Sequence, residues 1–198
     1  KYIVQCWVDG FIREKKDYTI KKYVSLNIPC GMERLGKLLI EELRKLNLIP
    51  LVGQPYTKGA NRQYSYDHRF DIALLLDRYY VDESLKIAED ILEELKDFLI
   101  NQAGPVYIDL FGEAPFIPET KSSIIQFNSE QEQLYRELIS RNSFLYLKYY
   151  RPNETSFTII AFPTPEIGPQ FPEIFADTVK FNTLDSQKYA FLQQKIID

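Results

Sequence analysis

Apolar and polar positions follow two different spacings in the first part of the chain. In KKYVSLNIP (21–29) they alternate, which predicts a strand of about seven residues. In the next stretch, 30–47, leucines recur three and four positions apart, which predicts an amphipathic helix. The apolar segment LIPLV (48–52) then predicts a second, short strand, and the apolar residues of 3–12 repeat at helical spacing ahead of all three.

The middle of the chain contains a continuous apolar run, DIALLL (71–76), between Asp71 and Asp77. Such a run is typical of a strand buried on both faces, so we predict a central strand here. The other predicted elements follow in sequence order: a long helix capped by Asp82, a strand at 106–112, a helix over 129–138 opened by a capping box at Ser129, strands at 143–150 and 156–162, and helices at 171–182 and 186–197.

Strands that alternate with helices at this spacing indicate parallel crossover connections. We therefore predict an α/β fold with an open, mostly parallel, doubly wound sheet of about five strands and helices on both faces. The segment Phe144–Tyr150 would form an antiparallel edge strand. Residues 1–198 would form a single α/β domain.

Both ends of the chain suggest a fragment of a larger protein. The chain begins at Lys1, and its only methionine is Met32. The helical pattern at the start has no capping residue ahead of it, and the last helix has no stop signal behind it. We accordingly interpret the chain as a fragment of a larger protein.

Composition narrows the possible partners and the cellular setting. Of the 198 residues, 45% are hydrophobic, enough for a substantial core, and the formal net charge is −4. A negative chain without a basic stripe argues against nucleic acid as a partner. No apolar run reaches the length of a membrane span, and the start is not a signal peptide, so we expect no membrane association. Two cysteines, Cys6 and Cys30, indicate no disulfide framework and favour a reducing, cytoplasmic setting.

The first predicted strand-to-helix turn, NIPCGMERLG, lacks the glycine spacing of dinucleotide-binding loops, and no P-loop motif occurs in the chain. We interpret Gly31 as a tight turn into the helix, with an anion bound at the helix start as the alternative. Cys30 lies at the same helix start, where a low thiol pKa would permit a dyad with His68. A structural cysteine is the simpler interpretation, because no nucleophile motif accompanies it.

Metal or cofactor binding by this chain alone is not predicted. One histidine and two distant cysteines supply no metal-binding motif, although a site made only of carboxylates stays open. Asp71 and Asp77 would lie at opposite ends of the predicted strand, roughly 20 Å apart, so they would not act as a pair. Asp77, at the carboxyl end, would be the better placed for a ligand.

The only histidine belongs to a tyrosine-rich loop ahead of the predicted central strand. Such a loop reaches the amino edge of the sheet, opposite the usual ligand edge. Its tyrosines would anchor the loop, form an interface with a missing domain or, least favoured, take part in catalysis. The candidate interdomain or substrate-chamber contacts are Tyr64, Tyr66, His68 and Asp77.

Four stretches, taken in order, resemble the amino-terminal part of thermophilic-type metalloaminopeptidases, the aminopeptidase T group, in a longer and less typical branch. They are YVSLNIPCGMERLGKLLIEELRKLNLIPLV, NRQYSYDHRFDIALLLDRYYVD, AGPVYIDLFGEAPF and ETSFTIIAFPTPEIGPQFPEIFADTVKFNTLD…QQKIID. The most specific part is TIIAFPTPEIG, followed by helices.

The resemblance implies an α/β domain followed by a carboxyl-terminal domain with a dinuclear metal site. The full-length protein would bind divalent zinc, cobalt or manganese and would hydrolyse peptides through a metal-activated water. It would also be able to form a homodimer. The family's metal ligands lie beyond the position that matches Asp198, so no residue here inherits a catalytic or metal-binding role. A non-catalytic α/β ligand-binding or assembly module that shares the scaffold is the alternative, and a nucleotide-dependent enzyme is a third interpretation.

Overall fold

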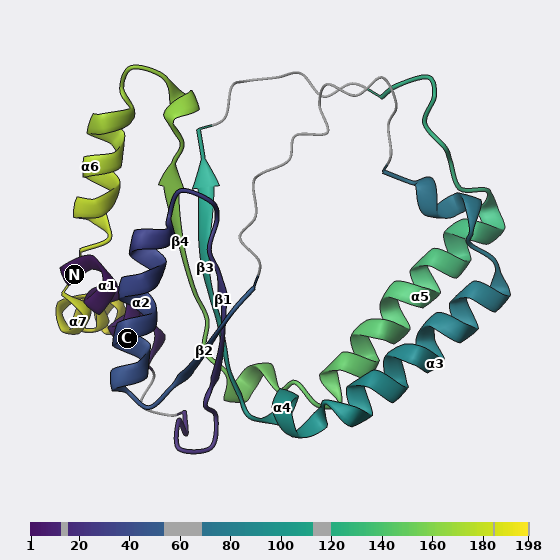
Figure 1. Cartoon of the computed structure of the whole chain (residues 1–198), viewed down its shortest axis with the longest axis horizontal. Coiled ribbons are helices and arrows are strands. Elements are labelled where there is room, and N and C mark those ends of the chain that lie inside the picture. Colours follow the sequence, from purple (N-terminus) through teal and green to yellow (C-terminus); the bar gives the residue numbers. More distant parts are fainter. Residues whose placement is uncertain (13–15, 54–68, 113–119, 184, 198) are drawn as a thin grey trace. The chain divides into compact units, whose positions relative to one another are not determined.

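A computed structural model of the protein describes residues 1–12, 16–53, 69–112, 120–183 and 185–197. The chain divides into two compact units, which are drawn together in Figure 1. The α/β unit comprises Lys1–Lys58, Asn101–Pro115 and Pro152–Asp198. The helical unit comprises Gly59–Ile100 and Phe116–Arg151. Each unit is therefore assembled from segments that are separated in the sequence.

The α/β unit is built on four parallel strands, which confirms the predicted α/β fold and parallel sheet. The strands are β1 (Tyr23–Asn27), β2 (Ile49–Val52), β3 (Gln102–Phe111) and β4 (Thr158–Pro163). Their order across the sheet is β2-β1-β3-β4, so the described residues form four strands instead of about five. All three strand pairings are parallel. The sequence indicated these strands because each contains an apolar stretch with turn residues beside it.

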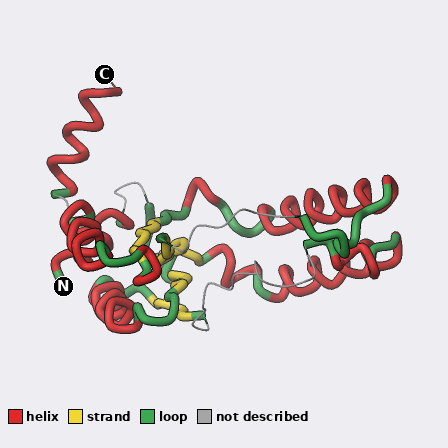
Figure 2. Tube along the Cα trace, turned by 90° about the horizontal axis from the view of Figure 1, so that it is seen from above, coloured by secondary structure: helices red, strands yellow, loops and turns green. Residues whose placement is uncertain are grey.

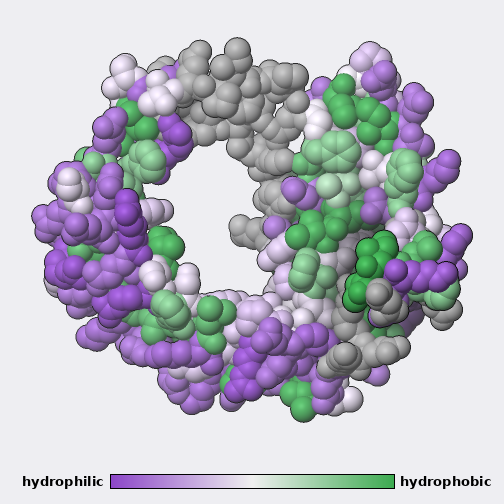
Figure 3. Space-filling view, turned by 180° about the vertical axis from the view of Figure 1, so that it is seen from behind, coloured by the Kyte–Doolittle hydropathy of each residue, from purple (hydrophilic) through white to green (hydrophobic). Residues whose placement is uncertain are grey.

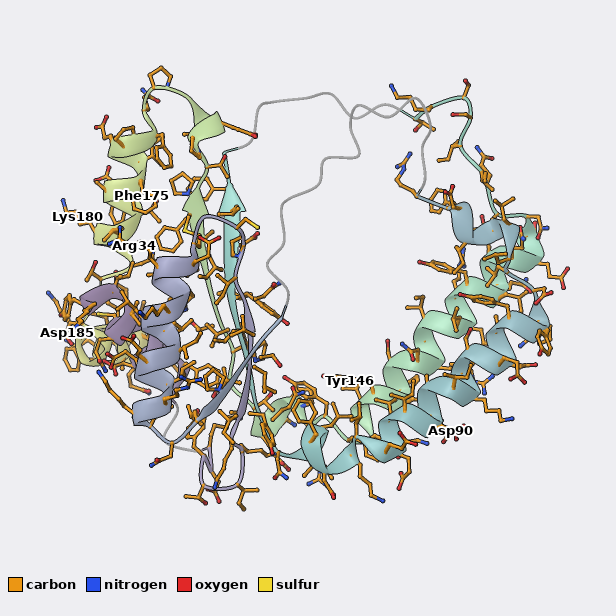
Figure 4. All side chains as sticks on the ribbon, viewed as in Figure 1. Arg34, Asp90, Tyr146, Phe175, Lys180 and Asp185 are labelled. Atoms are coloured by element: carbon orange, nitrogen blue, oxygen red, sulfur yellow. The ribbon has the colours of Figure 1, made fainter. Side chains whose placement is uncertain are left out.

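One face of the sheet is buried under helices. Leu26 pairs with Val106, and alternate residues of each strand share this face. Its buried side chains join those of α1 (Tyr2–Phe11) and α2 (Glu33–Lys45) in one core cluster. On α6 (Phe171–Phe181), Phe175 points toward β4, and its ring lies 5.4 Å from that of Phe162 (Figure 4). Figure 1 shows α1, α2 and α6 on the same side of the sheet.

The opposite face of the sheet carries half-exposed apolar side chains. Tyr107 pairs with Ile159 on this face, and Ile159 is 57% exposed. Two short 3-10 helices, η2 (Pro152–Glu154) and η3 (Pro165–Ile167), flank β4, and α7 (Ser186–Ile197) ends the described chain. Seen from behind, hydrophobic residues gather over parts of the α/β unit, whereas hydrophilic residues cover much of the helical unit (Figure 3).

The helical unit is a pair of parallel helices with short helices beside it. Its elements are η1 (Asp71–Leu74), α3 (Arg78–Glu94), α4 (Lys96–Ile100) and α5 (Ser129–Leu147). Figures 1 and 2 show α3 and α5 side by side. Buried Val81, Leu85 and Leu134, together with Leu76, form its core cluster. This core is small, so the pair leaves much apolar side-chain area at its surface.

The segment 71–76 is not a strand, which corrects the prediction of a buried central strand. It forms η1 and the turn that leads to α3. Ala73 and Leu76 are buried, whereas Leu74 and Leu75 are 72% and 66% exposed. The buried positions are three residues apart, the spacing of a helical turn, so the run packs through one side only.

The segment 143–150 is not a strand either, because α5 continues to Leu147 instead of ending near residue 138, and a turn follows at 148–149. No glycine or proline interrupts 129–147, so nothing ends the helix, and short apolar runs do not distinguish strand from helix. The capping box uses Asn128 and Gln131, one residue before the predicted position at Ser129. Likewise α3 begins one turn before Asp82, with Asp77 as its cap.

Candidate functional site

The carboxyl edge of the sheet is the candidate ligand edge of the α/β unit. The connection from β1 leads outward to β2, and the connection from β3 leads outward in the other direction to β4. The topological switch point therefore lies between β1 and β3, where open parallel sheets ordinarily bind ligands. The turns that follow β1 and β4 both reach this edge, and their polar groups determine what it can bind.

The turn after β1 is closed by its own carboxylate. Gly31 has φ +91°, which favours glycine and supports its interpretation as a tight turn. Its backbone N–H donates to the Glu33 carboxylate at 2.8 Å. This hydrogen bond lowers the pKa of Glu33 below its usual value, so the group is an anion at neutral pH. An anionic ligand at this turn would have to displace that carboxylate.

Cys30 lies in the same turn and is exposed. The Cys30–His68 dyad stays a prediction, because His68 falls outside the part of the chain that the structure describes. The same holds for Tyr64 and Tyr66.

The turn after β4 packs against the end of β3. The backbone N–H of Thr164 donates to the Phe111 carbonyl at 2.7 Å, which continues the pairing of the two strands by one residue. The hydroxyl oxygen of Thr164 is buried and has no hydrogen-bond partner among the described residues. This hydroxyl can still bond to a ligand or a water molecule at the carboxyl edge.

Asp77 has a structural role, which corrects its predicted position at the carboxyl end of a strand. Its carboxylate accepts a hydrogen bond from the Tyr80 backbone N–H at 2.7 Å and caps α3. The segment directly before Asp77 is not a strand, because 71–76 forms η1 and the turn after it. The general signal was visible in the sequence, since aspartate is a preferred N-cap residue.

Ion pairs join α3 to α5 at two levels. Arg78 binds the Glu137 carboxylate through two hydrogen bonds of 2.9 Å each, and Arg141 donates to the same carboxylate. The Arg78 and Arg141 guanidinium groups lower the pKa of Glu137. Farther along, Lys148 pairs with Glu89 at 2.9 Å. These pairs are exposed, so they fix the alignment of the helices more than they stabilise them.

Hollows occur in both units at the described surface, and none of those described below was predicted. The helical unit has a groove of about 330 Å³ near the charged side chains of Glu89 and Lys148, and a more apolar groove of about 630 Å³ near Ile91 and Tyr146. The α/β unit has a cavity of about 280 Å³ between α1, β4 and α7. Its walls come from distant parts of the sequence, so no local pattern could have revealed it.

The described residues contain no group of three or more histidine, cysteine, aspartate or glutamate side chains placed to hold a metal ion. Within the same part of the chain, no helix is long and apolar enough to cross a membrane. No protein-family model matches the chain, and no curated protein matches it either. The family resemblance accordingly stays a prediction that rests on the quoted residues.

Proposed function

We propose that this chain is the amino-terminal scaffold part of a metal-dependent aminopeptidase, an exopeptidase that releases amino-terminal residues from peptides. In this proposal a carboxyl-terminal domain supplies the dinuclear zinc, cobalt or manganese site, and the metal-activated water attacks the peptide bond. The observation that carries the proposal is the order of the four resembling stretches, the most specific of which is TIIAFPTPEIG (158–168).

That stretch has a definite place in the fold, which supports a scaffold role. It covers β4 and η3, and so it runs through the sheet and along its carboxyl edge. Buried Phe162 fixes the strand to α6, and Thr164 ties the turn to β3. Residues that hold a carboxyl edge in place are suited to form a wall of a neighbouring substrate chamber.

The proposal has further parts that follow from the sequence. Cysteine usage favours a cytoplasmic protein, and the family resemblance implies a possible homodimer as the assembly state. We also propose that helices cover the second face of the sheet, as predicted for a doubly wound fold, because sheets of parallel strands are usually buried on both faces. Tyr64, Tyr66 and His68 are proposed as contacts with the carboxyl-terminal domain or the substrate chamber.

The second candidate is a non-catalytic α/β ligand-binding or assembly module. The apolar groove of the helical unit favours it, because a pair of helices with so small a core exposes a surface suited to a partner. Ile91 and Leu147, which line this groove, are each 49% exposed. Matched metal ligands downstream would decide between the two candidates.

The experiment compares the complete gene product with the chain 1–198. Both are stripped of metal with a chelator, supplied in turn with zinc, cobalt and manganese, and assayed on aminoacyl nitroanilide substrates. We expect metal-dependent hydrolysis by the complete protein only, with no cleavage of an amino-terminally acetylated control substrate. An inactive complete protein under all three metals would refute the proposal, and activity in 1–198 alone would show that the catalytic site was misplaced.

A further inference from the structure

The cavity between α1, β4 and α7 has the size of a small-ligand site. Its volume of about 280 Å³ lies near the lower end of the range for ligand pockets, which is roughly 300–1,000 Å³. A cavity of about 150 Å³ holds benzene, so this one has room for about a dozen non-hydrogen atoms. Gly10 contributes no side chain to the α1 wall, and a Cβ built there would meet nothing within 4 Å.

A residue of the α1 wall has a buried hydrogen-bond donor. Trp7 lines the cavity and is only 5% exposed. Its indole nitrogen is buried and has no partner among the described residues. Buried tryptophan N–H groups usually find an acceptor, because an unmade hydrogen bond in the interior is costly. An acceptor on a ligand would satisfy this donor.

Another wall carries an acceptor. The side-chain nitrogen of Asn182 donates to the Thr178 carbonyl at 2.8 Å, which leaves its side-chain oxygen to accept a hydrogen bond. No charged side chain lines the described walls of the cavity. A ligand charge would therefore enter without a counter-charge, so a neutral ligand is favoured.

A third wall is the edge strand β4, with Thr158, Ile159 and Ile160, and the fourth is α7, with Tyr189, Ala190 and Gln193. One side of an edge strand is not paired within its sheet, and extended amide groups bind such edges. Beside the polar groups of Thr158, Tyr189 and Gln193, the walls combine an indole donor, an amide acceptor and apolar surface, and this set is complementary to an amide with an apolar substituent.

We propose that the α1–β4–α7 cavity binds a small, uncharged amide that carries an apolar substituent. This chemistry is shared by a free aliphatic amide and by a hydrophobic residue within a peptide chain. The indole N–H of Trp7 donates to the ligand carbonyl, and the side-chain oxygen of Asn182 accepts from the ligand N–H. The proposal concerns this cavity alone and does not rest on the aminopeptidase function.

The test uses the fluorescence of Trp7, which is the only tryptophan of the chain and so reports on the cavity itself. The protein is titrated with N-acetyl-leucinamide and, in parallel, with N-acetyl-leucine. We expect saturable binding of the amide at roughly millimolar concentration. The carboxylate should bind about tenfold more weakly, because its charge has no partner in the cavity. No saturable change with the amide, or equal affinity for both compounds, would overturn the proposal.

Two variants test the location. Gly10→Leu should fill the cavity and weaken binding by about tenfold or more without unfolding the protein, because leucine is a better helix former than glycine. Gln5→Leu, an exposed position of the same helix that does not line the cavity, is the matched control and should bind as the wild type does. Unchanged binding in Gly10→Leu would contradict the assignment.

If Gly10→Leu does not fold, as judged by circular dichroism, Asn182→Leu gives an independent answer, because it removes the proposed acceptor and should also weaken binding by about tenfold. Wild-type affinity in that variant would overturn the proposal.

An acetylated tripeptide amide with leucine at its centre then distinguishes the two sources of the ligand, a free amide and a peptide segment. Tighter binding than the single amide indicates a peptide segment along β4, and weaker binding indicates a free small amide.

Discussion

Replacing Gly104 by alanine should destabilise the α/β unit more than replacing Gly31 or Gly10. Gly104 lies in β3 with φ +127°, a conformation that L side chains rarely adopt. A Cβ at this position would lie 1.7 Å from the carbonyl oxygen of Ser156 and 2.8 Å from its carbonyl carbon. The Ser156 N–H donates to the Ala103 carbonyl at 2.7 Å, so the two backbones are held together at this point.

The expected cost has two parts. Holding an alanine at positive φ costs about 1–3 kcal/mol. Moving the backbone to relieve an overpacked contact costs about 1–3 kcal/mol more. We therefore expect Gly104→Ala to lower the free energy of unfolding by about 2–6 kcal/mol, a large part of the roughly 5–15 kcal/mol that is typical of a domain.

The measurement is urea unfolding followed by the fluorescence of Trp7, which is buried in the α/β unit. Two replacements serve as controls. Gly31→Ala has positive φ but open space, so it should cost only about 1–2 kcal/mol. Gly10→Ala, in α1 with open space, should be neutral or stabilising by up to about 1 kcal/mol. A Gly104→Ala midpoint that corresponds to less than about 0.5 kcal/mol of destabilisation would refute the close approach of β3 to Ser156.

Three further predictions concern the helical unit. Leu85→Asp should lower the free energy of unfolding by several kcal/mol because Leu85 is 4% exposed, whereas Leu75→Asp should change it by about 0.5 kcal/mol or less. Equal unfolding midpoints of the two variants, followed by circular dichroism, would contradict this. Asp77→Ala should cost about 1 kcal/mol and speed amide exchange in the first turn of α3, and unchanged exchange would argue against the cap. The carboxyl of Glu137 should titrate below the usual glutamate pKa in an NMR pH series. Its contribution to the free energy of unfolding is therefore present above the unfolded-state pKa and is lost as the pH falls through the folded-state pKa. In Arg78→Ala the pKa should rise toward the usual value, and an unchanged midpoint would contradict the ion pair.

Elements with a strong period were predictable from the sequence. The alternation in 21–29 indicated β1, and the leucine spacing after it indicated α2, because each element buries one face against the same core. The runs at 106–112 and 156–162 indicated β3 and β4 for a similar reason. Parallel pairing followed from the alternation of strands and helices.

The segments 71–76 and 143–150 were predicted wrongly because apolar content alone does not determine a period. Leu74 and Leu75 are exposed, so an apolar run in this chain does not imply burial on both faces. The candidate site was less predictable than the fold. The predicted ligand-edge position of Asp77 relied on a strand that does not form. The cavity is lined by Trp7 and Asn182, which only the tertiary structure brings to one place.

The strand order has a consequence for how the chain folds during synthesis. Leu26 in β1 pairs with Val106 in β3, about 80 positions later, and contacts of such long range slow folding. At about 5–20 residues per second, the ribosome needs roughly 3–12 s to continue from the end of β2 to the end of β3. During that interval β1, a central strand of the finished sheet, has an open edge able to pair with other nascent chains. Slower translation of residues 53–111 should therefore increase aggregation of this chain.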